Sequence, residues 1–281
     1  MHDMEDTNSG HTRGLMRPIG WLAGTTKHHN ALIRALNNVL TTDLARRTLG
    51  QIVDSFVLYG AFFGDTRAAY GQCSELNADV LLKRGQSRAK VDIRTLRVDA
   101  AVLSEFCEAE IDSTIFQQKL IELVARAVHA MAIVLYQKVP DTTWRPDFHP
   151  WYSDSQSFPD GEADGVGYWA EDRILGGVVL FDRRDRDEVP NTALEYKNDA
   201  VYFHPSAEGT SPRIYQLKDS QRQALLDYLF GAATPSAPEP PATFLPIRCD
   251  SDNSISVDPM ETTSIYRDKW ERLLTRHEQG E

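Results

Sequence analysis

The chain has 281 residues, enough for one large domain or two modest ones with a buried core. Its net charge is −11, from 30 basic and 41 acidic residues, and an acidic surface repels phosphate backbones, which excludes general electrostatic binding of nucleic acid. The first 20 residues lack the apolar centre of a signal peptide, and the longest apolar run, residues 127–136, is about half a membrane span. We therefore expect a soluble, cytoplasmic protein that contacts neither nucleic acid nor membrane.

The three cysteines agree with that compartment. Cys73, Cys107 and Cys249 are odd in number and scattered, which matches neither a disulfide framework nor a zinc-ligand pattern. Reduced thiols in the cytosol are the expected state.

The N-terminal half is predicted to be helical over residues 25–138, after a disordered tail of residues 1–20. Apolar residues at helical spacing predict helices from Thr25 to about residue 40 and over residues 43–63. The strongest helix follows Ser113 and ends before Pro140, with an apolar stripe so wide that it indicates packing on more than one side. His129 interrupts this stripe, and we interpret it as a hydrogen-bonded core histidine, with a catalytic role as the alternative.

Residues 78–102 are ambiguous. Val91 and Ile93 alternate with charged residues as in a strand, and Leu96 and Val98 do so again after a slip of one residue. The stretch is strongly basic, which favours a solvated loop or an edge strand. A docking patch for an acidic partner is the alternative.

The second half is predicted to be β-rich over residues 165–230. Strand-forming residues flank the pair Gly176 and Gly177, which we interpret as either a hairpin turn or a bulge. Residues 200–204 and 213–217 predict an antiparallel hairpin, and a helix follows over residues 219–230.

The predicted fold class is α+β, with a helical half packed on a small antiparallel sheet of four or five strands and a covering helix. A single domain spans residues 21–231. Residues 232–246 form a proline-rich linker, and residues 247–281 form a tail with a short helix over about residues 263–277.

Residues 140–165 form a loop that is both acidic and aromatic. Between Pro146 and Pro190 there are 11 acidic and 4 basic residues. Aromatic side chains amid carboxylates are typical of interface anchors, so this loop is the predicted contact surface of a binding or accessory protein. The predicted binding residues are Trp144, Trp151, Tyr152 and Trp169.

The alternative function is a small-molecule enzyme, with His149, Glu171, Asp182 and His204 around a pocket. Two imidazoles and two carboxylates can bind Zn²⁺ or Fe²⁺, or serve as acid and base. Their spacing matches no compact ligand motif, so a solvated acidic rim with a strand-end histidine stays open, and we predict no metal site and no particular cofactor. The chain also lacks a phosphate-binding glycine loop, a G-x-S-x-G elbow, H-E-x-x-H and C-x-x-C.

One resemblance bears on the source of the chain. Residues 164–183 (DGVGYWAEDRILGGVVLFDR), with residues 201–205 and 213–217, resemble a group of uncharacterised filamentous-fungal proteins without an assigned activity. The resemblance covers about residues 145–230. It implies a fungal cytosolic protein, would place the alternative enzyme in fungal secondary metabolism, and brings no catalytic residues with it.

Overall fold

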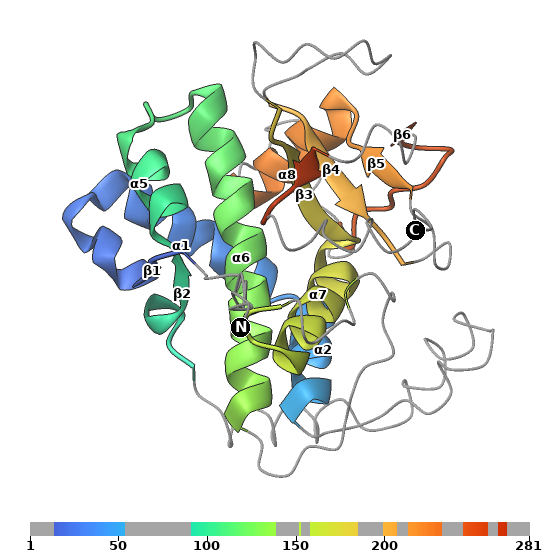
Figure 1. Cartoon of the computed structure of the whole chain (residues 1–281). Helices are drawn as coiled ribbons and strands as arrows, with labels where there is room; N and C mark the ends of the chain where they lie inside the picture. Colours follow the sequence, from blue (N-terminus) through green and yellow to red (C-terminus); the bar gives the residue numbers. More distant parts are fainter. Residues whose placement is uncertain are drawn as a thin grey trace, which may run out of the picture.

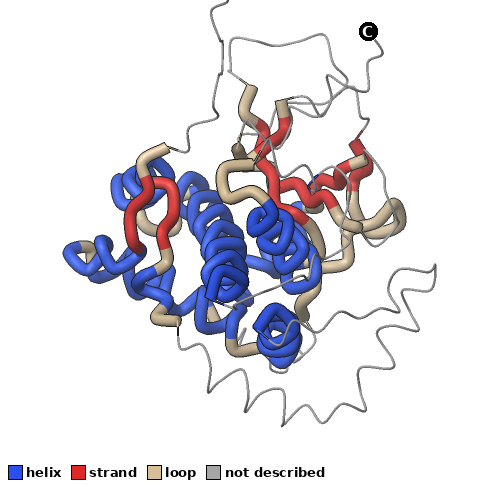
Figure 2. Tube along the Cα trace, turned by 60° about the horizontal axis from the view of Figure 1, so that its bottom comes forward, coloured by secondary structure: helices blue, strands red, loops and turns tan. Residues whose placement is uncertain are grey.

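The computed structural model describes residues 14–53, 91–138, 152, 158–184, 199–206, 213–231, 244–257 and 264–268. Helices surround one long central helix, and a small antiparallel sheet lies beside them (Figures 1 and 2). The predicted α+β fold class is confirmed.

The central helix is α6 (Thr114–Lys138), as predicted, and it is buried on several sides. It packs against α1 (Thr26–Leu40), α2 (Asp43–Val53) and α5 (Ala100–Glu108). By length and composition α6 is apolar enough to cross a membrane, but 72% of its apolar stretch is buried inside the protein. Within the described structure, α6 is therefore a core helix of the fold.

The sheet is antiparallel throughout, in the order β6-β5-β4-β3-β7. The predicted hairpin is confirmed as β4 and β5. The strands are β3 (Val178–Asp182), β4 (Val201–His204), β5 (Ile214–Gln216), β6 (Ile255–Val257) and β7 (Ile265–Tyr266).

Both edge strands come from the segment predicted to be a tail. β7 pairs with β3 through Phe181–Tyr266 and Asp182–Ile265, so the helix predicted from residue 263 is wrong for these residues. Residues 269–277 of that predicted helix lie outside the described residues. The carboxyl-terminal segment therefore completes the sheet.

Both faces of the sheet are buried at β3, β4 and β5. Val179, Phe181 and Phe203 point into the main core with the helices, whereas Val178 and Leu180 join a second cluster with Tyr152, Phe158 and Tyr168. A strand that is buried on both faces has a continuous apolar run, which explains the Val-Val-Leu-Phe sequence of β3.

The helix α7 (Glu162–Leu175) occupies the segment where the sequence predicted the first strands. That prediction was wrong: Tyr168, Trp169 and Ile174 favour strands, but the helical spacing of the buried Val166, Ala170 and Ile174 decides. Tertiary packing thus overrides local propensity here.

Gly176 and Gly177 are neither a hairpin turn nor a bulge, because they join the end of α7 to β3. Gly176 adopts the left-handed conformation (φ 109°) that ends many helices. A Cβ on Gly176 would also lie 2.1 Å from the carbonyl oxygen of Ile247, so only glycine fits.

The covering helix is confirmed as α8 (Asp219–Phe230), which ends at Gly231. Leu225, Leu226 and Leu229 belong to the same core as the inner residues of the sheet. Asn38 of α1 ties α8 down, because its amide donates to the carbonyls of Tyr228 and Leu229.

A second, two-stranded sheet pairs β1 (Met16–Pro18) with β2 (Arg97–Asp99). Short 3-10 helices adjoin it, η1 (Ile19–Gly24) and η2 (Ile93–Thr95). Residues 16–20 were expected within a disordered tail, but they form β1 and the start of η1. β2 matches the edge strand expected in the basic stretch, of which residues 83–90 lie outside the described residues.

Candidate functional site

His129 of α6 lies between two carboxylates of α7. Its Nε2 is 3.0 Å from Asp164 Oδ1, and its Nδ1 is 3.1 Å from Glu171 Oε1. Both ring nitrogens therefore face acceptors, which favours the imidazolium with a proton on each nitrogen. Burial opposes the charged form, but the hydrogen bonds to Asp164 and Glu171 outweigh it and raise the pKa of His129 above its ordinary value.

Gly167 allows α6 and α7 to approach this closely. A Cβ at Gly167 would lie 2.6 to 2.7 Å from three atoms of the His129 ring. Glycine is a poor helix former, yet α7 contains both Gly165 and Gly167. At Gly167 the reason is that the imidazole of His129 occupies the space that a side chain would need.

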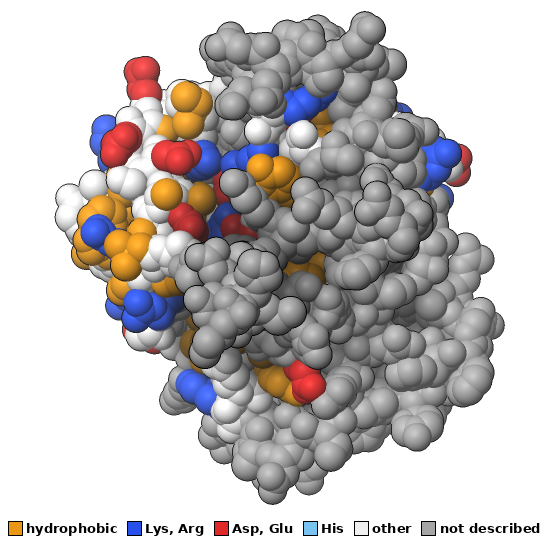
Figure 3. Space-filling model, viewed as in Figure 1, with side chains coloured by type: hydrophobic (Ala, Val, Ile, Leu, Met, Phe, Trp, Pro, Cys, Tyr) orange, Lys and Arg blue, Asp and Glu red, His pale blue; other side chains and the backbone are white. Residues whose placement is uncertain are grey.

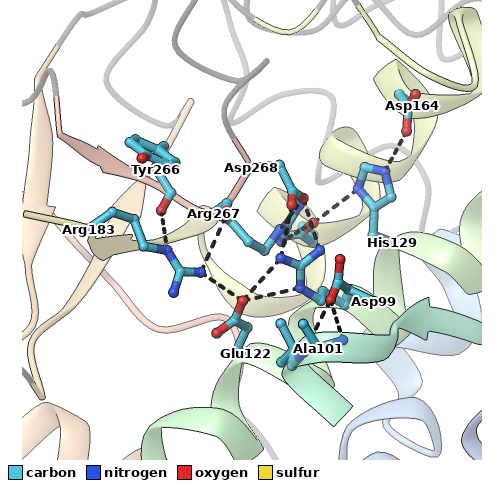
Figure 4. Close-up of polar contacts among 12 residues, drawn as sticks. Asp99, Ala101, Glu122, His129, Asp164, Arg183, Tyr266, Arg267 and Asp268 are labelled. Atoms are coloured by element: carbon cyan, nitrogen blue, oxygen red, sulfur yellow. Dashed lines mark hydrogen bonds and ion pairs between the residues drawn. The ribbon is translucent and has the colours of Figure 1, made fainter. Parts of the chain in front are cut away.

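Glu171 extends the chain of contacts to Arg267, which follows β7. Nη1 of Arg267 lies 2.9 and 2.8 Å from the two carboxylate oxygens, and the Val179 amide donates to Oε2 at 3.3 Å. Burial favours the neutral acid, but Arg267 and His129 outweigh it and lower the pKa of Glu171. Asp164, His129, Glu171 and Arg267 thus form one continuous charged chain (Figure 4).

A second charged group lies beside the first on α6. Glu122 is fully buried and accepts from Arg126 and Arg183, with its other oxygen 3.2 Å from Lys119 Nζ. Burial favours its neutral form, but Arg126, Arg183 and Lys119 outweigh it and lower the pKa of Glu122 to about 2. Arg126 also makes a two-pronged pair with Asp268 at 3.0 Å, next to Arg267.

Five residues of these two groups line one pocket, and we call them its charged floor: Arg126, His129, Asp164, Arg267 and Asp268. The pocket has a volume of about 300 Å³, which is at the lower end of the range for small-molecule sites. It lies among α6, the first half of α7, the two-stranded β1–β2 sheet and residues 267–268. Its apolar lining residues are Met16, Val98, Ala130, Ile133 and Val134.

Tyr168 also lines the pocket and contacts two members of the charged chain. Its ring makes a T-shaped contact with the imidazole of His129, with ring centres 4.5 Å apart. The guanidinium of Arg267 lies 5.7 Å from the centre of the Tyr168 ring, over its face. That contact is favourable, because the ring quadrupole attracts positive charge.

Of the four residues predicted as catalytic, the three in the described part of the chain are not brought together. Glu171 is hydrogen-bonded to His129, whereas Asp182 pairs with Arg184. His204 Nδ1 lies 2.8 Å from the hydroxyl oxygen of Tyr152. Asp182 and His204 lie at opposite ends of β3, because His204 pairs with Val178. Four residues of strand span about 13 Å. His149 lies outside the described residues.

Two of the four predicted binding residues belong to the described part of the chain. Tyr152 is 1% exposed and packs against Tyr168 in the second cluster, so it presents no contact surface. Trp169 is half-buried, with the guanidinium of Arg173 4.8 Å from its ring centre. Trp144 and Trp151 lie outside the described residues.

The interpretation of His129 as a hydrogen-bonded core histidine is confirmed, but the sequence reasoning missed Arg126, Arg267 and Asp268. A usable indication existed for Arg126. It lies on a helix that is apolar on several sides, together with Lys119 and Glu122, and buried charges of this kind need partners. Arg267 and Asp268 carry no such indication, because only the fold brings them to α6.

The arrangement restricts what His129 can do. With a proton on each nitrogen it has no lone pair for a metal or for a substrate proton, so it acts as a fixed cation until one proton leaves. Within the described parts of the chain, no group of three or more His, Cys, Asp and Glu side chains is placed to hold a metal ion.

Comparisons with known protein families, with curated proteins and with solved structures find no match for this chain.

Proposed function

We propose that this protein binds a small molecule in the pocket among α6, α7 and the two-stranded β1–β2 sheet. The observation that carries the proposal is the floor of that pocket, where His129, Arg126 and Arg267 are held by buried carboxylates. Buried ion pairs add little stability compared with apolar packing, so a cluster of them at a pocket is a candidate functional site.

This proposal retains the small-molecule hypothesis from the sequence but places the site at different residues. The histidine and carboxylates that converge are His129, Asp164 and Glu171, of which only Glu171 belongs to the predicted set. Of these two carboxylates, Asp164 lines the pocket, so acid–base chemistry on a bound molecule would involve Asp164.

The hypothesis of a protein contact surface at residues 140–165 gains less support. Of its aromatic residues in the described structure, Tyr152 and Phe158 are both buried in the second cluster. Interface anchors are exposed in the free protein, whereas these two side chains stabilise the fold.

We also propose a cytosolic, fungal origin, as the resemblance suggests. Cys107 and Cys249 are both free thiols, and such cysteines agree with a reducing compartment.

A pocket-filling substitution tests the proposed function. Ala130→Phe places a ring at a residue that lines the pocket. The control, Ala23→Phe, makes the same change at an exposed alanine of η1. Ligand-observed NMR with a library of small fragments identifies binders of the unmodified protein. We expect Ala130→Phe to abolish binding of a group of fragments that Ala23→Phe retains.

Circular dichroism and thermal unfolding establish that both variants are folded. If Ala130→Phe is folded and retains every fragment that the unmodified protein binds, the pocket is not the binding site and the proposal fails.

A further inference from the structure

The pocket contains four positive groups among its described lining residues. Arg97, Arg126 and Arg267 are guanidinium groups, and His129 has both ring nitrogens against carboxylates. Three of these four lie on the floor, and Arg97 lies on β2 at the side, where it donates to the carbonyl of Met16 at 2.8 Å.

Four negative groups balance them. Asp99, Asp160, Asp164 and Asp268 line the same pocket. The formal charge of the described lining residues is therefore zero, in a chain whose net charge is −11. The face in Figure 3 shows the same mixing, since acidic and basic side chains alternate among apolar ones over the helical part.

Most of these charges are already engaged with one another. Arg126 is paired with Asp268, and His129 with Asp164, at 3.0 Å in both cases. A ligand with a full charge would lose its hydration on entry and would meet no net opposite charge in return. A neutral ligand avoids this cost and still finds hydrogen-bonding groups on the floor.

The apolar part of the lining adds a second requirement. Met16, Val98, Ala130, Ile133 and Val134 contribute apolar side chains from β1, β2 and α6. A volume of about 300 Å³ corresponds to about ten water molecules at ~30 Å³ each. Replacing this water with apolar ligand surface is favourable.

We infer that the ligand of this pocket is a neutral, amphipathic small molecule that carries hydroxyl, carbonyl or amide groups together with apolar surface. This inference rests on the proposed function and specifies its ligand class. The polar groups would bind to lining residues such as Asp164, Tyr168 and Asp268, and the apolar surface would pack on lining residues such as Ile133 and Val134.

The test uses a fragment set that shares ring systems and differs in charge. Each ring is present as a neutral alcohol or amide, as a carboxylate and as an amine, and only binding that Ala130→Phe abolishes is counted. We expect the neutral members to bind at least about tenfold more tightly than both charged members, a difference of about 1.4 kcal/mol.

The outcomes separate the two proposals. If a carboxylate or an amine binds the pocket as tightly as its neutral counterpart or more so, this inference is overturned and the binding function stands. If Ala130→Phe abolishes no binding, the proposed function falls and the inference with it.

A charge change at the pocket side provides a second measurement. Arg97→Gln makes the described lining one unit negative, and we expect the amines to gain about two- to fivefold in affinity. Arg94→Gln removes the same charge from a nearby residue outside the lining, so it should leave the preference unchanged. An equal gain in both variants would show that the balance of charge inside the pocket does not select the ligand.

Discussion

Among the described residues, two histidines are buried, and their surroundings differ. His129 is held by two carboxylates in a chain that continues to Arg267. His204 is 1% exposed and is joined to the hydroxyl of Tyr152 within a cluster of aromatic and aliphatic side chains. One environment is built from charges, and the other from apolar contacts and a hydrogen bond.

This difference shows which interactions stabilise each of the two regions. Around His204, apolar burial holds the fold and the hydrogen bond contributes about 1 kcal/mol. Around His129, each charge depends on its neighbours, and removal of one leaves another buried without its partner. His129 lines the pocket described above, which is the reason for placing function there.

The largest expected effect is at the centre of the charged chain. Glu171→Gln removes the carboxylate that holds both His129 and Arg267, and we expect a loss of about 3 to 5 kcal/mol in the free energy of unfolding. Urea denaturation measures it. A loss below about 1 kcal/mol would mean that the chain is not a coupled unit.

The next effect tests the close approach of α6 and α7. Gly167→Ala places a Cβ against the His129 ring, and we expect a loss of about 1 to 3 kcal/mol in the free energy of unfolding. In a His129→Ala background the clash is gone, so the same change should stabilise by up to about 1 kcal/mol through helix propensity.

The control for Gly167 is Gly165→Ala on the same helix. A Cβ there meets only the carbonyl oxygen of Tyr152 at 3.4 Å, an ordinary contact, so we expect no comparable loss. If Gly167→Ala has the same sign in both His129 backgrounds, the imidazole is not what requires glycine.

A smaller effect is expected at the other histidine. Tyr152→Phe removes one hydrogen bond to His204 and retains the ring, so we expect a loss of about 1 kcal/mol, and at most about 3 kcal/mol. Chemical denaturation in parallel with Glu171→Gln compares the two environments directly. A loss equal to that of Glu171→Gln would erase the distinction between them.

We also expect the free energy of unfolding to depend on pH through His129. The pKa of His129 is raised in the folded state by its hydrogen bonds to Asp164 and Glu171. Tyr168 also contacts the imidazole, and Arg267 pairs with Glu171 behind it. The contribution of His129 is therefore complete below the unfolded pKa of about 6.5 and is lost as the pH rises through the folded pKa. One proton sets a maximum slope of about 1.4 kcal/mol per pH unit.

NMR titration of the imidazole, together with unfolding between pH 6 and pH 9, measures this loss. His129→Gln should remove that part of the slope, and His204→Gln should retain it. A folded-state pKa of His129 at or below about 6.5 would contradict the imidazolium assignment.

Sequence periodicity predicted the elements whose apolar pattern is long and regular. α6 and α8 match their predicted ranges, because many residues at helical spacing agree in each. α7 was predicted as strands, because its aromatic residues and glycines favour a strand and its helical pattern is short. The edge strands β6 and β7 have only three and two residues, too few for any periodicity.

The candidate site shows the same division. The sequence by itself determined that His129 is a polar residue on a buried helix face and therefore needs a hydrogen-bond partner. Only the tertiary structure decided which partners it has, because Asp164 and Glu171 lie 35 and 42 residues away, and Arg267 lies 96 residues beyond Glu171. Contacts over such separations leave no local pattern, so the charged floor of the pocket exists only once α6, α7 and β7 have packed together.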